Sequence, residues 1–127
     1  MDINIPAVKA EVEAAFAKYE QALITNDVET LQALFFNSPH TIRYGIGENL
    51  YGSDEIGAFR QARSAVGLMR TTARTVITTY GQDFATASTL FYRETMPGKV
   101  GRQMQTWVRT PDGWRVVAAH VSVIPEK

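Results

Sequence analysis

Cysteine is absent from the 127-residue sequence, which excludes disulfide frameworks, thiolate zinc sites, thiol nucleophiles and thiol redox motifs together. No apolar run approaches the roughly 20 residues that cross a bilayer, and the first residues lack the basic and apolar regions of a signal peptide. We therefore expect a cytoplasmic protein with no membrane partner. The two histidines, His40 and His120, lie far apart and form no metal-ligand motif, so no metal is expected.

The sequence also has no excess of charge. Thirteen Lys and Arg residues balance thirteen Asp and Glu residues, which argues against a nucleic-acid partner because phosphates demand a surplus of basic side chains. Residues 1–55 contain nine acids and three bases, whereas residues 56–127 contain four acids and ten bases. Nine of the bases are arginine, the side chain that grips a carboxylate with two hydrogen bonds. This pattern is consistent either with salt bridges between the two halves or with an arginine-lined site for a small anion.

Several enzyme signatures are missing. There is no P-loop, no glycine-rich dinucleotide motif and no GxSxG nucleophile elbow. No Asp or Glu occupies an inward position of an amphipathic helix, so a buried carboxylate base has no candidate. The side chains that remain for chemistry are tyrosine and arginine, acting on an anion.

Length and apolar periodicity predict one domain over residues 1–127 that begins with helices. Apolar residues at steps of three and four predict a helix over residues 6–24, and a short second helix covers about residues 28–35. Ser53 is expected to cap a third helix. The inward stripes of the three helices are Val8, Val12, Phe16, Tyr19 and Leu23; Val28, Leu31, Leu34 and Phe35; and Ile56, Phe59, Arg63 and Val66.

The rest of the chain is typical of strands. Residues 41–44 predict one strand, which is followed by a turn region at residues 45–52. Segments rich in β-branched and aromatic residues, separated by glycine-containing turns, predict an antiparallel meander of four more strands at residues 70–80, 84–94, 101–110 and 114–124. Three helices and a sheet of four or five strands make an α+β layer with the helices on one face.

The last strand predicts an interface. Alternation places Val116 and His120 on one face of this strand and Val117 and Ala119 on the other, so both faces are largely apolar. The helices cover only one face. A second copy of the chain is the obvious cover for the other, and we expect a homodimer or higher homo-oligomer.

Two helical residues stand out because they place polar groups at inward positions. A buried phenol hydroxyl needs a hydrogen-bond partner, so Tyr19 is either a core residue bonded to a backbone carbonyl or a proton donor aimed into a cavity. An inward guanidinium must find an anion. Arg63 therefore either pairs with a carboxylate of the protein or binds a ligand.

Strand residues provide further candidates. Arg43, taken alone, is a solvated strand residue just before a glycine-rich loop. Gln103 and Gln105 share a strand face with Trp107, where two amides beside an aromatic ring are able to line a polar pocket. His120 is interpreted either as a core histidine or as part of the same pocket wall.

Nine segments of the chain form a distinctive set: residues 10–20, 26–27, 38–45, 48–52, 59–63, 79–81, 101–103, 105–109 and 113–122. This set resembles the AtzH-like (HpxZ-like) family of the SnoaL-like, NTF2-like superfamily, and it extends over nearly the whole chain. The resemblance implies a cone in which three N-terminal helices pack on a curved antiparallel sheet and enclose a pocket.

For function, the resemblance implies catabolism of cyanuric acid, oxalurate and other urea-like amides, beside amidases. It implies removal of a carboxyl group from 1,3-dicarboxyurea to give allophanate, with Tyr19 and Arg43 matching the catalytic pair. We expect Tyr19 as the acid, Arg43 as the anchor of a small dicarboxylate, Arg63, Gln105 and His120 as the pocket wall, and no cofactor. The alternative is a non-catalytic accessory subunit that binds a partner amidase, since one fold hosts enzymes, binders and assembly modules alike.

Overall fold

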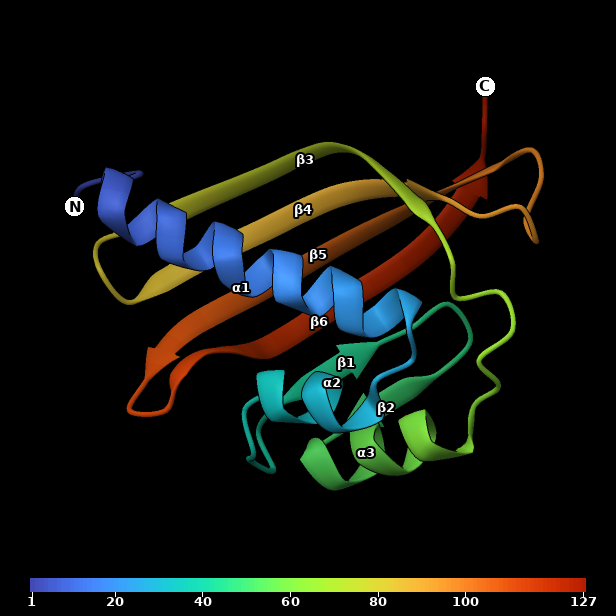
Figure 1. Cartoon of the computed structure of the whole chain (residues 1–127), viewed down its shortest axis with the longest axis horizontal. Coiled ribbons are helices and arrows are strands. Elements are labelled where there is room, and N and C mark those ends of the chain that lie inside the picture. Colours follow the sequence, from blue (N-terminus) through green and yellow to red (C-terminus); the bar gives the residue numbers. More distant parts are fainter.

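A six-stranded sheet with three helices packed on one of its faces makes up the chain (Figure 1). The computed structural model describes all residues from 1 to 127. In chain order the elements are α1 (Pro6–Ile24), α2 (Val28–Leu34), β1 (Ile42–Tyr44), β2 (Asn49–Tyr51), α3 (Ser53–Ala62), β3 (Thr71–Tyr80), β4 (Phe84–Tyr92), β5 (Lys99–Thr110) and β6 (Gly113–Pro125). The α+β layer expected from the sequence is confirmed.

Helices α1 and α2 form where the sequence predicts them. Pro6 occupies the first turn of α1, where its missing N–H has no helical partner to lose. Asp27 caps α2 by accepting a hydrogen bond from Thr30 N at 3.1 Å. No helix here combines the length with the hydropathy that a bilayer crossing requires. The predicted stripe of α1 is buried against the sheet and consists of Val8, Val12, Phe16, Tyr19 and Leu23.

Two carboxylates fix α1 to the sheet. Near the start of the helix, Glu11 Oε1 accepts hydrogen bonds from Trp114 Nε1 at 2.9 Å and Arg109 Nη1 at 2.6 Å, and these bonds lower the pKa of Glu11. Near its end, Glu20 accepts two hydrogen bonds from Arg70. The helix is therefore attached to the β5–β6 hairpin at one point and to the start of β3 at another.

Strands β3 to β6 form the predicted antiparallel meander, and the order across the sheet is β2-β1-β6-β5-β4-β3. Strand β1 joins this meander by pairing parallel to β6. Strand β2 lies in the segment predicted as a turn region, and it pairs antiparallel with β1. The prediction of four or five strands is therefore wrong by at least one. Strand β2 has only three residues, with Asn49 and Tyr51 exposed, so no apolar run marks it in the sequence.

Helix α3 begins differently from its prediction. Gly52, not Ser53, is the N-cap residue, and its φ of 86° lies in a region that favours glycine. Ser53 is the first helical residue. Its Oγ donates to Asn37 Oδ1 at 2.9 Å, and so it connects the helix to the segment after α2 instead of capping the helix.

Helix α3 also ends earlier than predicted. The backbone becomes extended at Arg63, so Val66 lies beyond the helix and is exposed. The buried side chain that follows Ile56 by one turn is Arg60. The predicted inward stripe through Val66 is therefore wrong, and Arg63 reaches the interior from the helix end, as described below.

A bulge in β6 changes which of its side chains face the helices. Trp107 pairs with Val116, but the preceding residue of β5 pairs with Ala118, which leaves Val117 as an extra residue. As a result Val116 and Ala119 are both buried in the core. The strict alternation predicted for this strand is wrong at Val117, since the bulge exchanges the two faces.

The face of the sheet opposite the helices is uncovered (Figure 1). Val76, Phe84 and Met104 are exposed apolar residues of the strands that form this face. Homodimerisation through this face stays a proposal.

Gly101 on β5 leaves room for the ring of Phe91, its partner on β4. Phe91 is completely buried, and a Cβ on Gly101 would overlap its ring atoms. We predict that Gly101→Ala lowers the free energy of unfolding by about 1–3 kcal/mol, because the ring has to move within a packed core. Urea unfolding followed by tryptophan fluorescence measures this change.

The matched control is Gly47→Ala, because nothing lies within 4 Å of the position that its Cβ would take. This variant is expected to change the free energy of unfolding by less than about 0.5 kcal/mol. Equal effects of the two substitutions would contradict the packing argument at Gly101.

Candidate functional site

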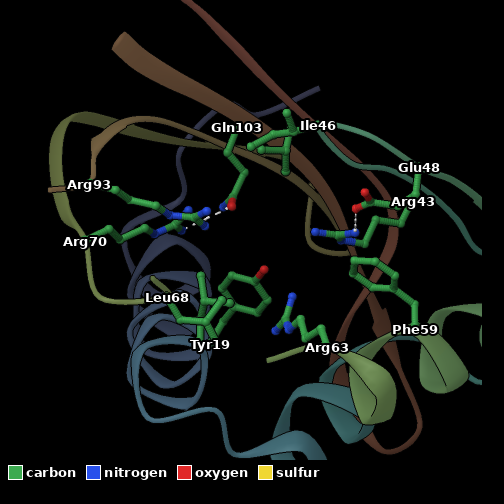
Figure 2. A pocket seen from close by; sticks show the side chains of 12 residues that line it. Tyr19, Arg43, Ile46, Glu48, Phe59, Arg63, Leu68, Arg70, Arg93 and Gln103 are labelled. Carbon is green, nitrogen blue, oxygen red and sulfur yellow. Dashed lines mark hydrogen bonds and ion pairs between the residues drawn. The ribbon is translucent and has the colours of Figure 1, made fainter. Parts of the chain in front are cut away.

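A pocket of about 180 Å³ lies between α1, the end of α3 and the inner face of the sheet (Figure 2). Pockets for drug-sized ligands usually exceed about 300 Å³, so this one suits a smaller molecule. Four of its lining residues are arginine and one is a carboxylate. The lining residues are Tyr19, Leu23, Arg43, Ile46, Glu48, Phe59, Arg63, Leu68, Arg70, Arg93, Gln103 and Val121.

Tyr19 comes from the buried stripe of α1, and its ring is held by aromatic neighbours. The ring centroids of Phe16 and Phe35 lie 6.5 Å and 6.3 Å from that of Tyr19. The Tyr19 hydroxyl points toward the middle of the pocket and is bonded to none of the residues around it (Figure 2). Of the two interpretations of Tyr19, the structure has the hydroxyl aimed into a cavity, where it is free to donate to a ligand.

Arg43 lies at the centre of β1 and faces the pocket. It is 8% exposed, so its interpretation as a solvated strand residue is wrong. Its Nη1 donates to Glu48 Oε1 at 2.9 Å, and its Cζ lies 5.4 Å from the ring centroid of Phe59. Gly45 permits this ion pair, because a Cβ there would overlap the Glu48 carboxylate. Arg43 is thus oriented by a neighbour that the hairpin between β1 and β2 supplies.

Arg63 follows the last residue of α3 and directs its guanidinium into the pocket (Figure 2). Its Nε and Nη2 are buried and have no hydrogen-bond partner. Burial lowers the pKa of Arg63, and the charge of Arg43 lowers it further. The structure gives Arg63 no carboxylate partner, which is the arrangement expected of a ligand-binding residue.

Arg60 is enclosed behind the pocket. It is 1% exposed, its Cζ lies 4.2 Å from the ring centroid of Phe35, and its Nε and Nη1 have no partner. Burial is the main reason that the pKa of Arg60 is lowered to about 10, and the charges of Arg43 and Arg63 act in the same direction. An anion in the pocket would reduce this cost.

Arg70 and Arg93 lie on the side of the pocket opposite Arg43 (Figure 2). Arg70 pairs with Glu20 and donates to Gln103 Oε1 at 3.1 Å. Arg93 makes no ion pair. Burial and then the charge of Arg70 lower the pKa of Arg93.

No group of three histidine or carboxylate side chains gathers anywhere in the structure to hold a metal ion. The chemical character of the site is therefore that of a basic pocket for an anion.

Gln105 and His120 do not line this pocket. Gln105 pairs with Ala119 and is buried in the core, where its Oε1 accepts a hydrogen bond from Trp107 Nε1 at 3.1 Å. His120 pairs with Met104, and both are exposed on the outer face. Successive residues of a strand point to opposite faces, and the register sets Ala119, not His120, opposite Gln105. The expectation that Gln105 and His120 share one pocket wall is corrected for this reason.

Arg70, Arg93 and Glu48 are pocket residues that sequence reasoning missed. Arg70 and Arg93 lie directly beyond the last residue pair of the β3–β4 hairpin, so the hairpin register was the available signal. For Glu48 the signal was the tight β1–β2 hairpin, in which Gly45 N donates to Glu48 O at 2.9 Å. Neither signal is visible without knowing how the strands pair.

Comparisons with known proteins agree with this fold. The model of the AtzH-like family matches residues 1–127. A protein of unknown function from Pectobacterium atrosepticum is 58% identical over 97% of this chain and 95% of its own, with a TM-score of 0.95. A protein with a cystatin-like fold from Burkholderia xenovorans is 50% identical over 100% of this chain and 99% of its own, with a TM-score of 0.96.

A more distant structure, an NTF2-like superfamily protein from Salmonella enterica, is 26% identical over 95% of this chain and 93% of its own, with a TM-score of 0.74. No curated protein sequence matches the chain. The architecture is therefore that of the NTF2-like, cystatin-like proteins, as the resemblance implied.

Arg60→Met tests the cost of the buried charge, because Met fills similar space without a guanidinium. The lowering of the pKa of Arg60 from its ordinary value to about 10 corresponds to roughly 3 kcal/mol against the charged folded state. The variant is therefore expected to raise the free energy of unfolding of the ligand-free protein by about 1–3 kcal/mol. Urea unfolding at neutral pH measures this gain.

The same variant has a pH signature. Because the pKa of Arg60 is lower in the folded state than its ordinary value, the penalty on the wild type is complete below about pH 10 and disappears as the pH rises from there toward the ordinary pKa of arginine. The stability difference between Arg60→Met and wild type should be constant below this window and shrink within it. A constant difference throughout, or a less stable variant, would contradict the assignment.

Proposed function

Because the chain belongs to the AtzH-like family, we propose that it is an enzyme that removes CO₂ from 1,3-dicarboxyurea and yields allophanate. The observation that carries this proposal is the unbonded Tyr19 hydroxyl inside a pocket lined by four arginines. 1,3-Dicarboxyurea is small, planar and doubly anionic, so it complements the pocket in size and charge. The family resemblance points to Tyr19 and Arg43 as the catalytic pair.

In this proposal Arg43 holds one carboxylate of the substrate. Glu48 occupies one edge of the guanidinium and fixes its orientation, while a nitrogen of Arg43 is directed to the pocket centre (Figure 2). Arg63 supplies further donors beside it, since its Nε and Nη2 are unpaired. A bound carboxylate would accept hydrogen bonds from these nitrogens, which are unfavourable to bury without a partner.

The reaction breaks the bond between a carboxylate carbon and the adjacent urea nitrogen. CO₂ leaves, and the electron pair of that bond stays on the nitrogen, from which it is delocalised onto the urea carbonyl. The Tyr19 O–H donates its proton to this nitrogen, and the Tyr19 phenolate then recovers a proton from water. One dianion and one proton thus give CO₂ and the allophanate monoanion, in a scheme that calls on no cofactor.

The arginines around Tyr19 favour the charge that this step creates. An ionised Tyr19 would raise the pKa of Arg60, Arg63 and Arg93, which burial otherwise lowers. The phenolate and these guanidinium groups therefore attract one another. Since the groups are in place before the proton moves, the stabilisation requires no rearrangement during the reaction.

Tyr19→Phe is predicted to lower kcat by about 10²–10⁴-fold, the usual contribution of a general acid. The fold should be unchanged, because the hydroxyl is bonded to no neighbouring residue. CO₂ release and allophanate formation measure turnover, and thermal unfolding checks the fold. The control is Tyr80→Phe, which removes a hydroxyl from an exposed tyrosine of β3 and should keep the parent rate.

Turnover at the parent rate in Tyr19→Phe would exclude the phenol as the acid. A wild-type protein that releases no CO₂ from 1,3-dicarboxyurea, and that co-purifies with a co-expressed amidase, would favour the accessory-subunit alternative.

Arg43→Lys is predicted to raise KM by about tenfold or more and to lower kcat as well, because an ammonium group cannot hold a carboxylate with two parallel hydrogen bonds. Thermal stability should change little, since Lys still offers a positive charge to Glu48. Steady-state kinetics separates the two constants. Arg102→Lys, at an exposed arginine bonded to Ser122 Oγ, serves as the control, and an unchanged KM in Arg43→Lys would argue against the anchor.

A further inference from the structure

The residues that line the Arg43 end of the pocket leave one positive charge unbalanced, in addition to the buried charge of Arg60 behind it. Arg43 and Arg63 contribute two guanidinium groups there, and Glu48 is the carboxylate paired with them. In the proposed function, one carboxylate of the ligand occupies this end. The pocket continues past the Tyr19 hydroxyl to a second basic end (Figure 2).

At this second end, strand pairing brings two more arginines together. Arg70 precedes β3 and Arg93 follows β4, and their Cζ atoms lie 4.6 Å and 5.0 Å from the ring centroid of Phe91. Glu20 pairs with Arg70, and Arg93 has no ion-pair partner. Two guanidinium groups again share one carboxylate, so this end also carries one unbalanced positive charge.

Arg70 acts here as a positioning residue. Its side chain is 1% exposed, its Nε donates to Glu20 Oε2 at 3.2 Å, and its Nη2 donates to Glu20 Oε1 and to Gln103 Oε1. Because Gln103 Oε1 accepts this bond, Gln103 Nε2 is left as a donor, buried and without a partner. Gln103 is 2% exposed and lines the pocket. The amide is therefore held with its donor unsatisfied.

Arg93 supplies the charge at this end. Its Nε is also buried without a partner, and its pKa is lowered by burial first and by the charge of Arg70 next. A negative group would offset both effects. The unsatisfied atoms of Arg93 and Gln103 are all N–H donors, and donors of this kind match the oxygens of a carboxylate.

We propose that Arg93 and Gln103 form a second carboxylate subsite, so that the pocket selects ligands with a carboxylate at each end. The inference rests on the proposed function, because it assigns the second carboxylate of the same ligand. It favours 1,3-dicarboxyurea over oxalurate, which carries a single carboxylate. Arg93 is then a specificity residue that separates dianions from monoanions.

Two unreactive probes test this subsite. Glutarate has the same number of atoms between its carboxyl carbons as 1,3-dicarboxyurea, and its monoamide has the same length with one charge removed. Isothermal titration calorimetry on the full chain is expected to show glutarate binding at least about tenfold more tightly than the monoamide. Arg93→Met should lose this preference while its affinity for the monoamide stays within about twofold of wild type.

Three further variants make the result specific. Arg102→Met removes an exposed arginine outside the pocket and should leave both affinities unchanged. Arg93→Lys keeps the charge and should recover part of the preference for glutarate. Gln103→Glu keeps an acceptor for Arg70 but replaces the Nε2 donor by a negative oxygen, so it should abolish the preference even where Arg93→Met fails to fold.

Equal affinities of the wild type for the two probes would overturn the proposal. So would an Arg93→Met variant that keeps the preference or weakens both probes equally. Because neither probe reacts, these outcomes do not depend on turnover. A wild type that prefers glutarate but releases no CO₂ from 1,3-dicarboxyurea would overturn the proposed function and leave the subsite standing.

Discussion

The pocket buries more guanidinium groups than there are carboxylates to pair with them, and this excess of positive charge determines its character. Such burial is unfavourable in the absence of a counter-charge, and burial lowers the pKa of both Arg60 and Arg93. Aromatic rings give partial compensation, since Phe35 and Phe91 lie under these two guanidinium groups. The chain has no net charge, so the basic character of the pocket arises from where folding places the charges. In the proposed function, a small dianionic ligand resolves this imbalance.

Local patterns in the sequence predicted the frame of the site. The apolar stripe of α1 placed Tyr19 inward, and the structure confirms that orientation. Glycine-containing turns located the four strands of the meander to within a few residues. These predictions succeed because the periods of helices and strands follow from backbone geometry alone. Arg43 required the family resemblance, because a lone arginine in a three-residue strand is typical of a solvent-exposed position. Its burial depends on the pairing of β1 with β6 and on the contact with Phe59 of α3, neither of which the sequence shows.

The placement of Arg70, Arg93 and His120 depends on strand register, which the sequence does not show. Near the turn of the β3–β4 hairpin, Tyr80 pairs with Phe84 and Val76 with Ser88. If this register continued along both strands, Arg70 would lie opposite Glu94, and the two charges would cancel. A bulge at Arg74, whose φ is 51°, shifts the register by one residue and brings Arg70 beside Arg93 instead. A non-glycine residue in this left-handed region is uncommon and carries no sequence signal of its own. Register also turned His120 to the outer face of the sheet.

The attachment of α1 at Glu11 and Glu20 makes the helix a rod anchored at two distant points. Tyr19 is adjacent to Glu20, the second anchor. The position of its hydroxyl is therefore fixed by the fold before a ligand binds. Little motional freedom is then left for association to remove. The two attachments of α1 together set the position of the Tyr19 hydroxyl. In the proposed reaction this matters for the rate, because a displacement of about 1 Å at a reacting group is enough to slow chemistry by about a hundredfold.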